Sequence, residues 1–142
     1  MLYASATLCY DLPRVLAFMR QYLPGLKAGE GQAAIGRERR GRLVAGALYE
    51  GFNGRNIWMH VAAEPGAWWM TRTYLRACFA YPFRVCKVER ITGYVDESNA
   101  RSVHFVQRLG FRPEARLAGA APDGSDVTLY VMRRADCRWL EV

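Results

Sequence analysis

The sequence predicts an α/β domain (α+β) in which helices cover a mixed, mostly antiparallel sheet. Residues 33–63 hold three strand-like runs separated by turn signals, which is typical of an antiparallel meander. Residues 85–95 form a β-rich run, and the segment after it has helical periodicity up to Gly110. No repeat or Pro/Ser-rich linker divides the 142 residues, so we expect one domain over residues 1–142.

The N-terminal part predicts a short strand followed by a helix. Asp11 can cap this helix, and Pro13 fits its first turn. Pro24 and Gly25 predict its end. The apolar stripe of the helix consists of Leu12, Val15, Leu16 and Met19.

The meander is predicted from turn chemistry between its strands. The three runs are residues 33–40, 43–52 and 56–63. Gly41 joins the first two, and Asn53-Gly54 is a strong signal for a two-residue hairpin between the second and the third.

The middle of the chain predicts a second helix and a further strand. Pro65-Gly66 ends the meander, and residues 67–81 follow with a helical pattern. Pro82 predicts the end of that helix, because the residue before a proline is biased away from helical geometry. Residues 85–95 then predict a strand.

The last helix has clear boundary signals. Asn99 is an N-cap residue type, and Gly110 lies where a left-handed C-cap residue belongs. The apolar positions Val103, Val106 and Leu109 repeat at helical spacing.

The C-terminal part predicts a hairpin. Residues 115–120 and 127–133 form its strands, and Asp123-Gly124 forms its turn. The predicted order of elements along the chain is therefore βα, βββ, α, β, α, ββ.

The charge balance predicts a basic surface. The chain holds 20 Lys and Arg against 13 Asp and Glu, a formal net charge of +7. Such a surface attracts phosphorylated cofactors, but it lacks the interleaved aromatic residues of a nucleic-acid site, and we expect no nucleic-acid partner. The chain shows no signal-peptide pattern and no apolar run of the roughly 20 residues that cross a membrane. We therefore expect a cytoplasmic protein without a membrane partner.

The cysteines and histidines form no metal-binding pattern. His60 and His104 are far apart, and the cysteines are scattered without a Cys-x-x-Cys pair. The cysteines are Cys9, Cys78, Cys86 and Cys137. We expect no metal, and we expect reduced cysteines in the core.

The segment from Asn99 to Phe111 resembles the last βα segment of the GNAT superfamily of N-acetyltransferases. The family pattern is Asn-x-x-Ala/Ser followed by Leu-Gly-Phe, which Asn99, Ser102 and Leu109-Gly110-Phe111 match. The predicted order of elements is similar to the GNAT fold over nearly the whole chain. The resemblance implies a central sheet of six to seven strands with splayed strands 4 and 5, and about three to four helices.

The resemblance implies acetyl-CoA as the cofactor. In the family, the fourth strand offers main-chain groups to the pantetheine arm, and the matching residues here are Met59, Val61 and Ala63. The family asparagine near the pantetheine corresponds to Asn99, which also serves as an N-cap. The implied cofactor residues that follow it are Ser102, Phe105 and Arg108.

The phosphate-binding loop departs from the family pattern, Arg/Gln-x-x-Gly-x-Gly/Ala. The corresponding window is Gly66-Ala67-Trp68-Trp69-Met70-Thr71. In one interpretation, Gly66 and Ala67 allow close backbone approach while Thr71 and Arg72 bind the phosphates. In the other, the loop binds no cofactor, and Trp68 and Trp69 are core or interface residues.

The resemblance leaves the acid and the base open, because Val106 stands where many GNATs carry a tyrosine acid. Tyr94 is the first candidate base or acid, since strand alternation directs it to the same face as Asp96. Glu50 is the second candidate, and the others are His60 and Glu64. Alternation sets His60 on the face opposite Met59 and Val61, which predicts a packed histidine.

The leading hypothesis is an N-acetyltransferase that moves acetyl from acetyl-CoA to a primary amine by direct attack in a ternary complex. The ending Arg138-Trp139-Leu140 is similar to the branch that acetylates ribosomal-protein N-termini, which favours a peptide or protein amine. The alternative is a non-catalytic GNAT-fold module that binds CoA or a protein. We expect the acceptor pocket at the first helix with residues 23–32 and at residues 118–126, and a homodimer is left open.

Overall fold

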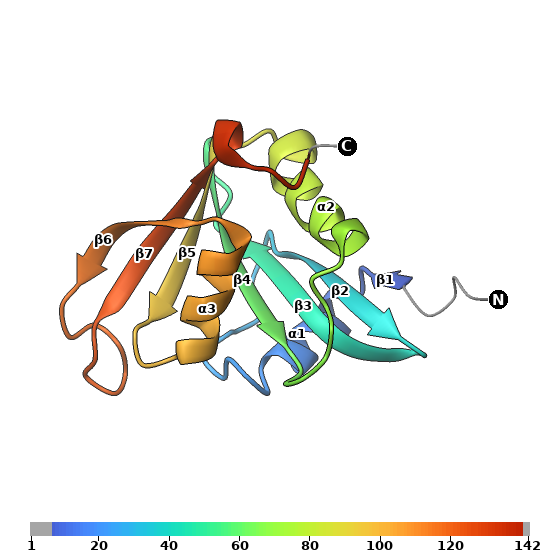
Figure 1. The fold of residues 1–142 in the computed structure, drawn as a ribbon, viewed down its shortest axis with the longest axis horizontal. Helices are drawn as coiled ribbons and strands as arrows, with labels where there is room; N and C mark the ends of the chain where they lie inside the picture. Colours follow the sequence, from blue (N-terminus) through green and yellow to red (C-terminus); the bar gives the residue numbers. More distant parts are fainter. Residues whose placement is uncertain (1–6, 141–142) are drawn as a thin grey trace.

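The computed structural model describes residues 7–140, which form a seven-stranded sheet flanked by three α-helices (Figure 1). The strand order is β1-β2-β3-β4-β5-β7-β6, with antiparallel pairing except between β4 and β5. The strands are β1 (Thr7–Cys9), β2 (Ala33–Arg39), β3 (Arg42–Glu50), β4 (Asn56–Ala63), β5 (Arg90–Asp96), β6 (Arg112–Leu117) and β7 (Val127–Arg133). The helices are α1 (Leu12–Met19), α2 (Arg72–Ala80) and α3 (Ala100–Leu109). This architecture confirms the predicted fold class.

Strands β2, β3 and β4 form the predicted antiparallel meander. Arg40 and Gly41 both have positive φ angles, 54° and 78°, as a two-residue hairpin that follows the right-handed strand twist requires. The resulting register pairs Glu50 of β3 with Trp58 of β4. Because directly paired residues point to the same face of a sheet, these two side chains share a face.

Strands β4 and β5 pair over a short stretch and then separate. Residues 56–58 pair with residues 90–92, and beyond them Figure 1 shows the two strands diverging with α3 in front of the gap. At the point of divergence Thr92 Oγ1 donates to Asn56 Oδ1 at 2.5 Å, and Arg90 Nε donates to the same oxygen at 3.3 Å. Residues 59–63 of β4 therefore keep one edge without a β5 partner, which confirms the splay implied by the GNAT resemblance.

Helices cover both faces of the sheet. Helix α1 buries Val15 and Met19 against one face, and α2 and α3 bury Phe79 and Leu109 in the core on the other. The carboxylate of Asp11 accepts a hydrogen bond from the backbone N–H of Arg14 at 3.3 Å, which confirms the predicted cap of α1.

Helix α2 begins at Arg72, so the predicted start at residue 67 is wrong. Thr71 has extended backbone angles, and its Oγ1 accepts a hydrogen bond from Tyr74 N–H at 3.3 Å. This side chain caps the helix and leaves residues 67–70 in an irregular loop. The Tyr74 hydroxyl then donates to the Ile35 carbonyl at 2.8 Å, which ties α2 to β2.

Pro82 does not end the helical path, contrary to the prediction. The chain continues through a π-helical turn, Tyr81–Val85, in which Cys86 N–H donates to the Tyr81 carbonyl at 2.9 Å. Pro82 has no N–H to donate to the Cys78 carbonyl four residues earlier, and the Tyr49 hydroxyl donates to that carbonyl at 2.5 Å. Strand β5 consequently begins at Arg90 rather than at residue 85.

Strand β6 lies earlier in the chain than predicted, at Arg112–Leu117 rather than at residues 115–120. Gly110 has a φ of 104° and closes α3 as predicted, and the chain turns directly into β6 after it. Gly119 N–H donates to Asp126 Oδ1 at 2.8 Å, so the residues just after β6 belong to the connecting turn.

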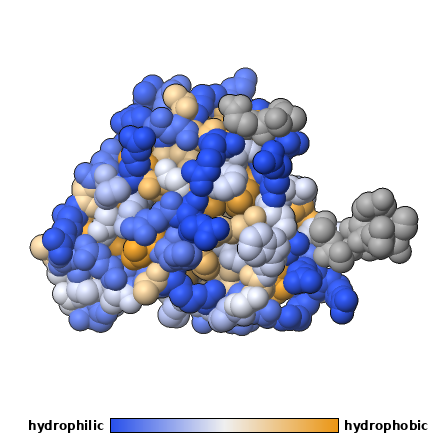
Figure 2. Space-filling model, viewed as in Figure 1, coloured by the Kyte–Doolittle hydropathy of each residue, from blue (hydrophilic) through white to orange (hydrophobic). Residues whose placement is uncertain are grey.

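The C-terminal residues pack against the fold. Trp139 Nε1 donates to the Leu109 carbonyl at 2.7 Å, and its ring stacks on Phe79 with centroids 6.4 Å apart. On the face seen in Figure 2, hydrophilic side chains predominate and apolar side chains appear in small separate areas. Within residues 7–140 no helix is both long enough and apolar enough to span a membrane.

Candidate functional site

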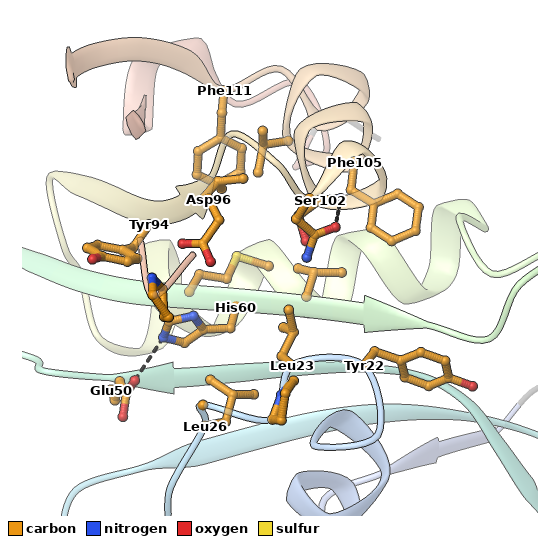
Figure 3. Close-up of a pocket in the computed structure, with 18 of the residues that line it drawn as sticks. Tyr22, Leu23, Leu26, Glu50, His60, Tyr94, Asp96, Ser102, Phe105 and Phe111 are labelled. Atoms are coloured by element: carbon orange, nitrogen blue, oxygen red, sulfur yellow. Dashed lines mark hydrogen bonds and ion pairs between the residues drawn. The ribbon is translucent and has the colours of Figure 1, made fainter. Parts of the chain in front are cut away.

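A cavity of about 570 Å³ opens where β4 and β5 diverge. Its walls come from both strands, from α3, and from the segment that follows α1 (Figure 3). Since α1 and α3 cover opposite faces of the sheet, we infer that the cavity passes through the sheet at the splay. Its lining includes Glu50, Met59, His60, Val61, Tyr94, Asp96, Asn99, Ser102, Phe105 and Val106. Both segments expected to form an acceptor pocket also reach it, through residues 23–27 and through Ala120 and Pro122.

His60 and Glu50 form a hydrogen-bonded pair in the cavity wall. His60 Nε2 lies 2.8 Å from Glu50 Oε2, and Gln32 Nε2 donates to Glu50 Oε1 at 2.9 Å. With Nε2–H directed at the carboxylate, the lone pair of the imidazole is on Nδ1. The His60 side chain is 16% exposed, so it is held in place and still accessible.

The prediction of a packed histidine holds only in part, because the His60 side chain is 16% exposed and lines the cavity. His60 does lie on the opposite sheet face from Met59 and Val61, yet all three line the same cavity. The reason is the splay, because β5 leaves β4 after Trp58 and opens both faces of the following residues to one space.

The cavity is lined by acidic side chains, although the chain as a whole has a net positive charge. Glu50 and Asp96 line it, and Tyr94, 41% exposed, stands two residues before Asp96 on β5. The lining residue with a fixed positive charge is Lys27. In a chain with a net charge of +7, two carboxylates in one cavity favour a positively charged occupant.

Helix α3 supplies the opposite wall of the cavity. Asn99 Oδ1 accepts the backbone N–H of Ser102 at 3.1 Å, which confirms the predicted N-cap. Because the Asn99 oxygen accepts the cap hydrogen bond, the donor that this side chain can offer is its NH₂ group. Val106 and the largely buried Phe105 make this wall apolar, whereas Arg108 is exposed and does not line the cavity.

The two tryptophans of the loop between β4 and α2 have different environments. Trp69 is 5% exposed and packs edge-on against Phe105, with ring centroids 5.0 Å apart, so it belongs to the core. Trp68 is 67% exposed, and its carbonyl accepts a hydrogen bond from Arg37 Nη1 at 2.8 Å. Burial lowers the pKa of the Arg37 guanidinium, which is nevertheless charged at neutral pH. Neither tryptophan lines the cavity at the splay.

The other predicted loop residues lie along the approach to α2. Gly66 has a φ of 79° and lies in the turn that begins at Glu64, next to Ala67, whose N–H donates to the Glu64 carbonyl at 3.2 Å. Thr71 caps α2, and Arg72 is exposed at the first helical position. An N-terminus of this kind offers backbone N–H groups to an anion.

Arg101 lies at the mouth of the splay, and the sequence analysis missed it. Its Nη2 donates to the carbonyl of Ala63 at 2.8 Å, at the end of the open β4 edge. The guanidinium also lies over the rings of Phe105 and Tyr22, at 5.4 and 5.8 Å from their centroids. A signal was present, because a cation in the first turn of a helix opposes the helix dipole and therefore suggests another partner.

No protein-family model and no curated protein sequence matches this chain. The fold does match solved structures of the spermidine N-acetyltransferase SpeG from Vibrio cholerae. One point mutant has a TM-score of 0.75 and 15% identity, and the match covers 97% of this chain and 98% of that chain. A second point mutant has a TM-score of 0.73 and 16% identity, with 95% and 98% covered.

A structure of the same enzyme described as dodecameric, in an intermediate state, has a TM-score of 0.71 and 15% identity, with 93% of this chain and 95% of that chain covered. At these identities the likeness establishes the fold, which is the GNAT fold predicted from the sequence. The similarity of the C-terminal ending to the ribosomal-protein branch stays a prediction.

Proposed function

We propose that this protein is an N-acetyltransferase that transfers acetyl from acetyl-CoA to a primary amine by direct attack in a ternary complex. The observation that carries the proposal is the cavity at the splay, which joins an unpaired β4 edge to the His60–Glu50 pair. The fold supports it, because the structures that this chain matches are those of an acetyltransferase.

Acetyl-CoA supplies an activated acetyl thioester, and the residues around the splay fit its pantetheine arm. The main chain at Met59, Val61 and Ala63 belongs to the β4 edge that has no β5 partner, so it is suited to pair with a peptide-like arm. The Asn99 amide stands across the gap as a further donor. The proposed set also includes Ser102 and Phe105, which line the cavity.

The phosphates of the cofactor are proposed to lie at the start of α2. The turn at Gly66 and Ala67 is small, and Thr71 and Arg72 begin the helix whose N–H groups attract an anion. Trp69 and Arg108 are not part of the proposed set, because Trp69 is a core residue and Arg108 is exposed and does not line the cavity. Trp68 remains a candidate contact for the adenine, as an exposed ring beside this loop.

His60 is the proposed base. The acceptor arrives as an ammonium ion, which must lose a proton before its nitrogen attacks the thioester carbon. Nδ1 of His60 accepts that proton, and Glu50 orients the imidazole and stabilises its charged form. As the N–C bond forms, the C–S bond breaks and CoA leaves as a thiolate, and the nitrogen releases its second proton to water to become the amide. The thiolate takes a proton from Tyr94 or from water, since Val106 has none to give.

The transfer is proposed to be direct rather than through an acylated cysteine. None of the described residues that line the cavity is a cysteine. Cys78 lies in the core, where burial raises the pKa of its thiol to about 12, so it stays protonated and unreactive.

The acceptor is proposed to be a small cationic amine. Glu50 and Asp96 in the cavity favour a positively charged group, and the matched structures are those of an enzyme that acetylates spermidine. The C-terminal ending, which favoured a peptide amine, packs on α3 through Trp139 and lies apart from the cavity lining.

Calorimetric titration with acetyl-CoA tests the cofactor site. We expect micromolar binding that Asn99→Ala and Arg72→Ala each weaken by about tenfold, a typical effect of losing one hydrogen-bonded or charged contact. Gln107→Ala, at an exposed position of α3, is the matched control and should leave the affinity unchanged. An absence of binding would overturn the enzyme proposal and leave the fold intact.

Thiol release from acetyl-CoA with a panel of amines tests the chemistry. We expect His60→Asn to lower kcat by about 10²- to 10⁴-fold with unchanged acetyl-CoA affinity, the usual range for a general base. Tyr94→Phe should lower kcat less, because water can protonate the thiolate; full turnover would exclude Tyr94 from catalysis. A protein that binds acetyl-CoA but releases thiol with no amine would instead be the non-catalytic module.

A further inference from the structure

We propose that a second hollow beside the cavity binds a distal positive charge of the acceptor, so that the preferred substrates are short diamines and related polycations. The hollow has a volume of about 390 Å³ and is lined by Glu50, Gly51, Trp58, His60 and Tyr94. We call it the Trp58 hollow. The inference rests on the proposed acetyltransferase activity and deepens it by naming the substrate class.

Strand register places the walls of the hollow together. Trp58 of β4 pairs with Glu50 of β3 on one side and with Thr92 of β5 on the other, so the three share a sheet face. His60 and Tyr94 stand two residues further along β4 and β5 and therefore share that face too. The Trp58 hollow is thus lined by side chains that three strands present on one face of the sheet.

Gly51 is needed for the position of the tryptophan ring. It has a φ of 66°, and a Cβ at this position would lie 2.6 Å from Trp58 Cδ1. Any other residue would therefore push the indole out of the hollow. The glycine and the ring form one side of it together.

The chemistry of the walls fits an alkylammonium group. Trp58 and Tyr94 offer aromatic faces, which attract cations, and Glu50 is an acceptor whose side chain is 35% exposed. Arg90 lies on the same face, but its guanidinium is paired with both carboxylate oxygens of Glu114, at 2.9 and 2.5 Å. That pairing keeps the nearby positive charge neutralised.

The position of the hollow sets the spacing of the two charges. It shares Glu50, His60 and Tyr94 with the cavity, so an acceptor can reach both at once. Trp58 and His60 are two residues apart on one strand face, a separation of about 7 Å. A diamine with a short alkyl chain bridges this distance, with one nitrogen at His60 and the other over Trp58.

Steady-state kinetics with butane-1,4-diamine and butylamine test the proposal, because the two share a chain length and differ in the distal charge. We expect kcat/KM to favour the diamine by about two- to fivefold in the wild type, the range of an exposed cation–π contact. Trp58→Leu should bring this ratio close to one. A ratio that Trp58→Leu leaves unchanged would overturn the proposal.

Two further variants separate recognition from folding. Trp58→Phe keeps an aromatic face and should restore part of the preference, which a purely structural role would not predict. Trp68→Leu is the matched control, because it removes an exposed tryptophan beside the proposed phosphate site. It should affect both amines equally and leave their ratio as in the wild type.

A binding experiment without acetyl-CoA distinguishes failure of the hollow from failure of the proposed function. Butane-1,4-diamine should change the tryptophan fluorescence of the wild type and not that of Trp58→Leu. This result would support the hollow even if no acetyl transfer were detected. Acetyl transfer without diamine preference would retain the enzyme and overturn the hollow.

Discussion

Gly46 on β3 determines how closely α1 lies against the sheet. A Cβ at this position would lie 2.8 Å from Met19 Cγ and 2.9 Å from Val15 Cγ1, and both α1 residues are fully buried. We expect Gly46→Ala to lower the free energy of unfolding by about 1–3 kcal/mol, because the helix must shift to make room. Urea unfolding followed by circular dichroism measures the loss.

Gly93 on β5 offers a matched control for that substitution. A Cβ there would lie 3.8 Å from Tyr130 Cβ and 4.0 Å from Val106 Cγ1, which is ordinary contact. Gly93→Ala should change the stability by no more than about 0.5 kcal/mol. An equal loss in both variants would show that close helix packing is not the cause.

Single residues were predictable where their role is local. Asp11 and Asn99 cap their helices as the sequence indicates, since a cap depends on residues three positions away. The positions of His60 and Trp58 were not predictable, because they depend on where a strand distant in the sequence stops pairing. Arg101 was missed for a similar reason, as its partner is the Ala63 carbonyl on another element.

At the scale of elements, Asn99 combines two roles at the start of α3. Asn99→Ala removes the cap and should cost about 1 kcal/mol of stability. Asn99→Asp keeps a capping oxygen but loses the NH₂ donor, so it should retain stability and still bind acetyl-CoA more weakly. Thermal melts and calorimetry on both variants test this, and an Asn99→Asp variant with full affinity would exclude the amide contact.

The turn between β6 and β7 gives the stability a dependence on pH. The Asp123 carboxylate accepts hydrogen bonds from the Ser125 hydroxyl and backbone N–H, and together with the Ser98 hydroxyl they lower its pKa to about 2. A depressed pKa stabilises the fold above the usual value of 3.8, and this contribution is lost as the pH falls towards 2. The wild type should therefore have a higher Tm than Asp123→Ala at pH 6, and this difference should become much smaller at pH 2. A constant difference would mean that the charge is not involved.

Most element types and their order were predictable, and the errors lie at boundaries set by local capping or by continued helical turns. The Thr71 cap shortens α2 at its start, and the π-helical turn Tyr81–Val85 delays β5. Both depend on geometry that hydrophobic periodicity does not report. The order of the meander strands was predictable because the turns carry residue signals, at Gly41 and Asn53-Gly54. The predicted two-residue hairpin at Asn53-Gly54 is wrong, however, because β3 ends at Glu50 and a five-residue loop precedes β4.

At the scale of the whole molecule, the outer strand β6 bears on assembly. Its residues are all exposed, and its charged side chains and Pro113 are typical of an edge that avoids pairing with another sheet. A homodimer, left open by the sequence, would therefore use another surface, and light scattering in solution measures the mass directly.

The sheet consists of two parts, β1–β4 and β5–β7–β6, joined by the short pairing of β4 with β5. Three residue pairs form this connection, and hydrogen bonds among the side chains of Asn56, Arg90 and Thr92 stabilise it. We expect a small rotation of one part against the other to widen the cavity while the strand pairing within each part stays intact. Backbone amides of residues 59–63 that face the gap should therefore exchange with deuterium faster than those of β3. Acetyl-CoA bound at the proposed site should slow that exchange, and equal rates with and without it would argue against such a rotation.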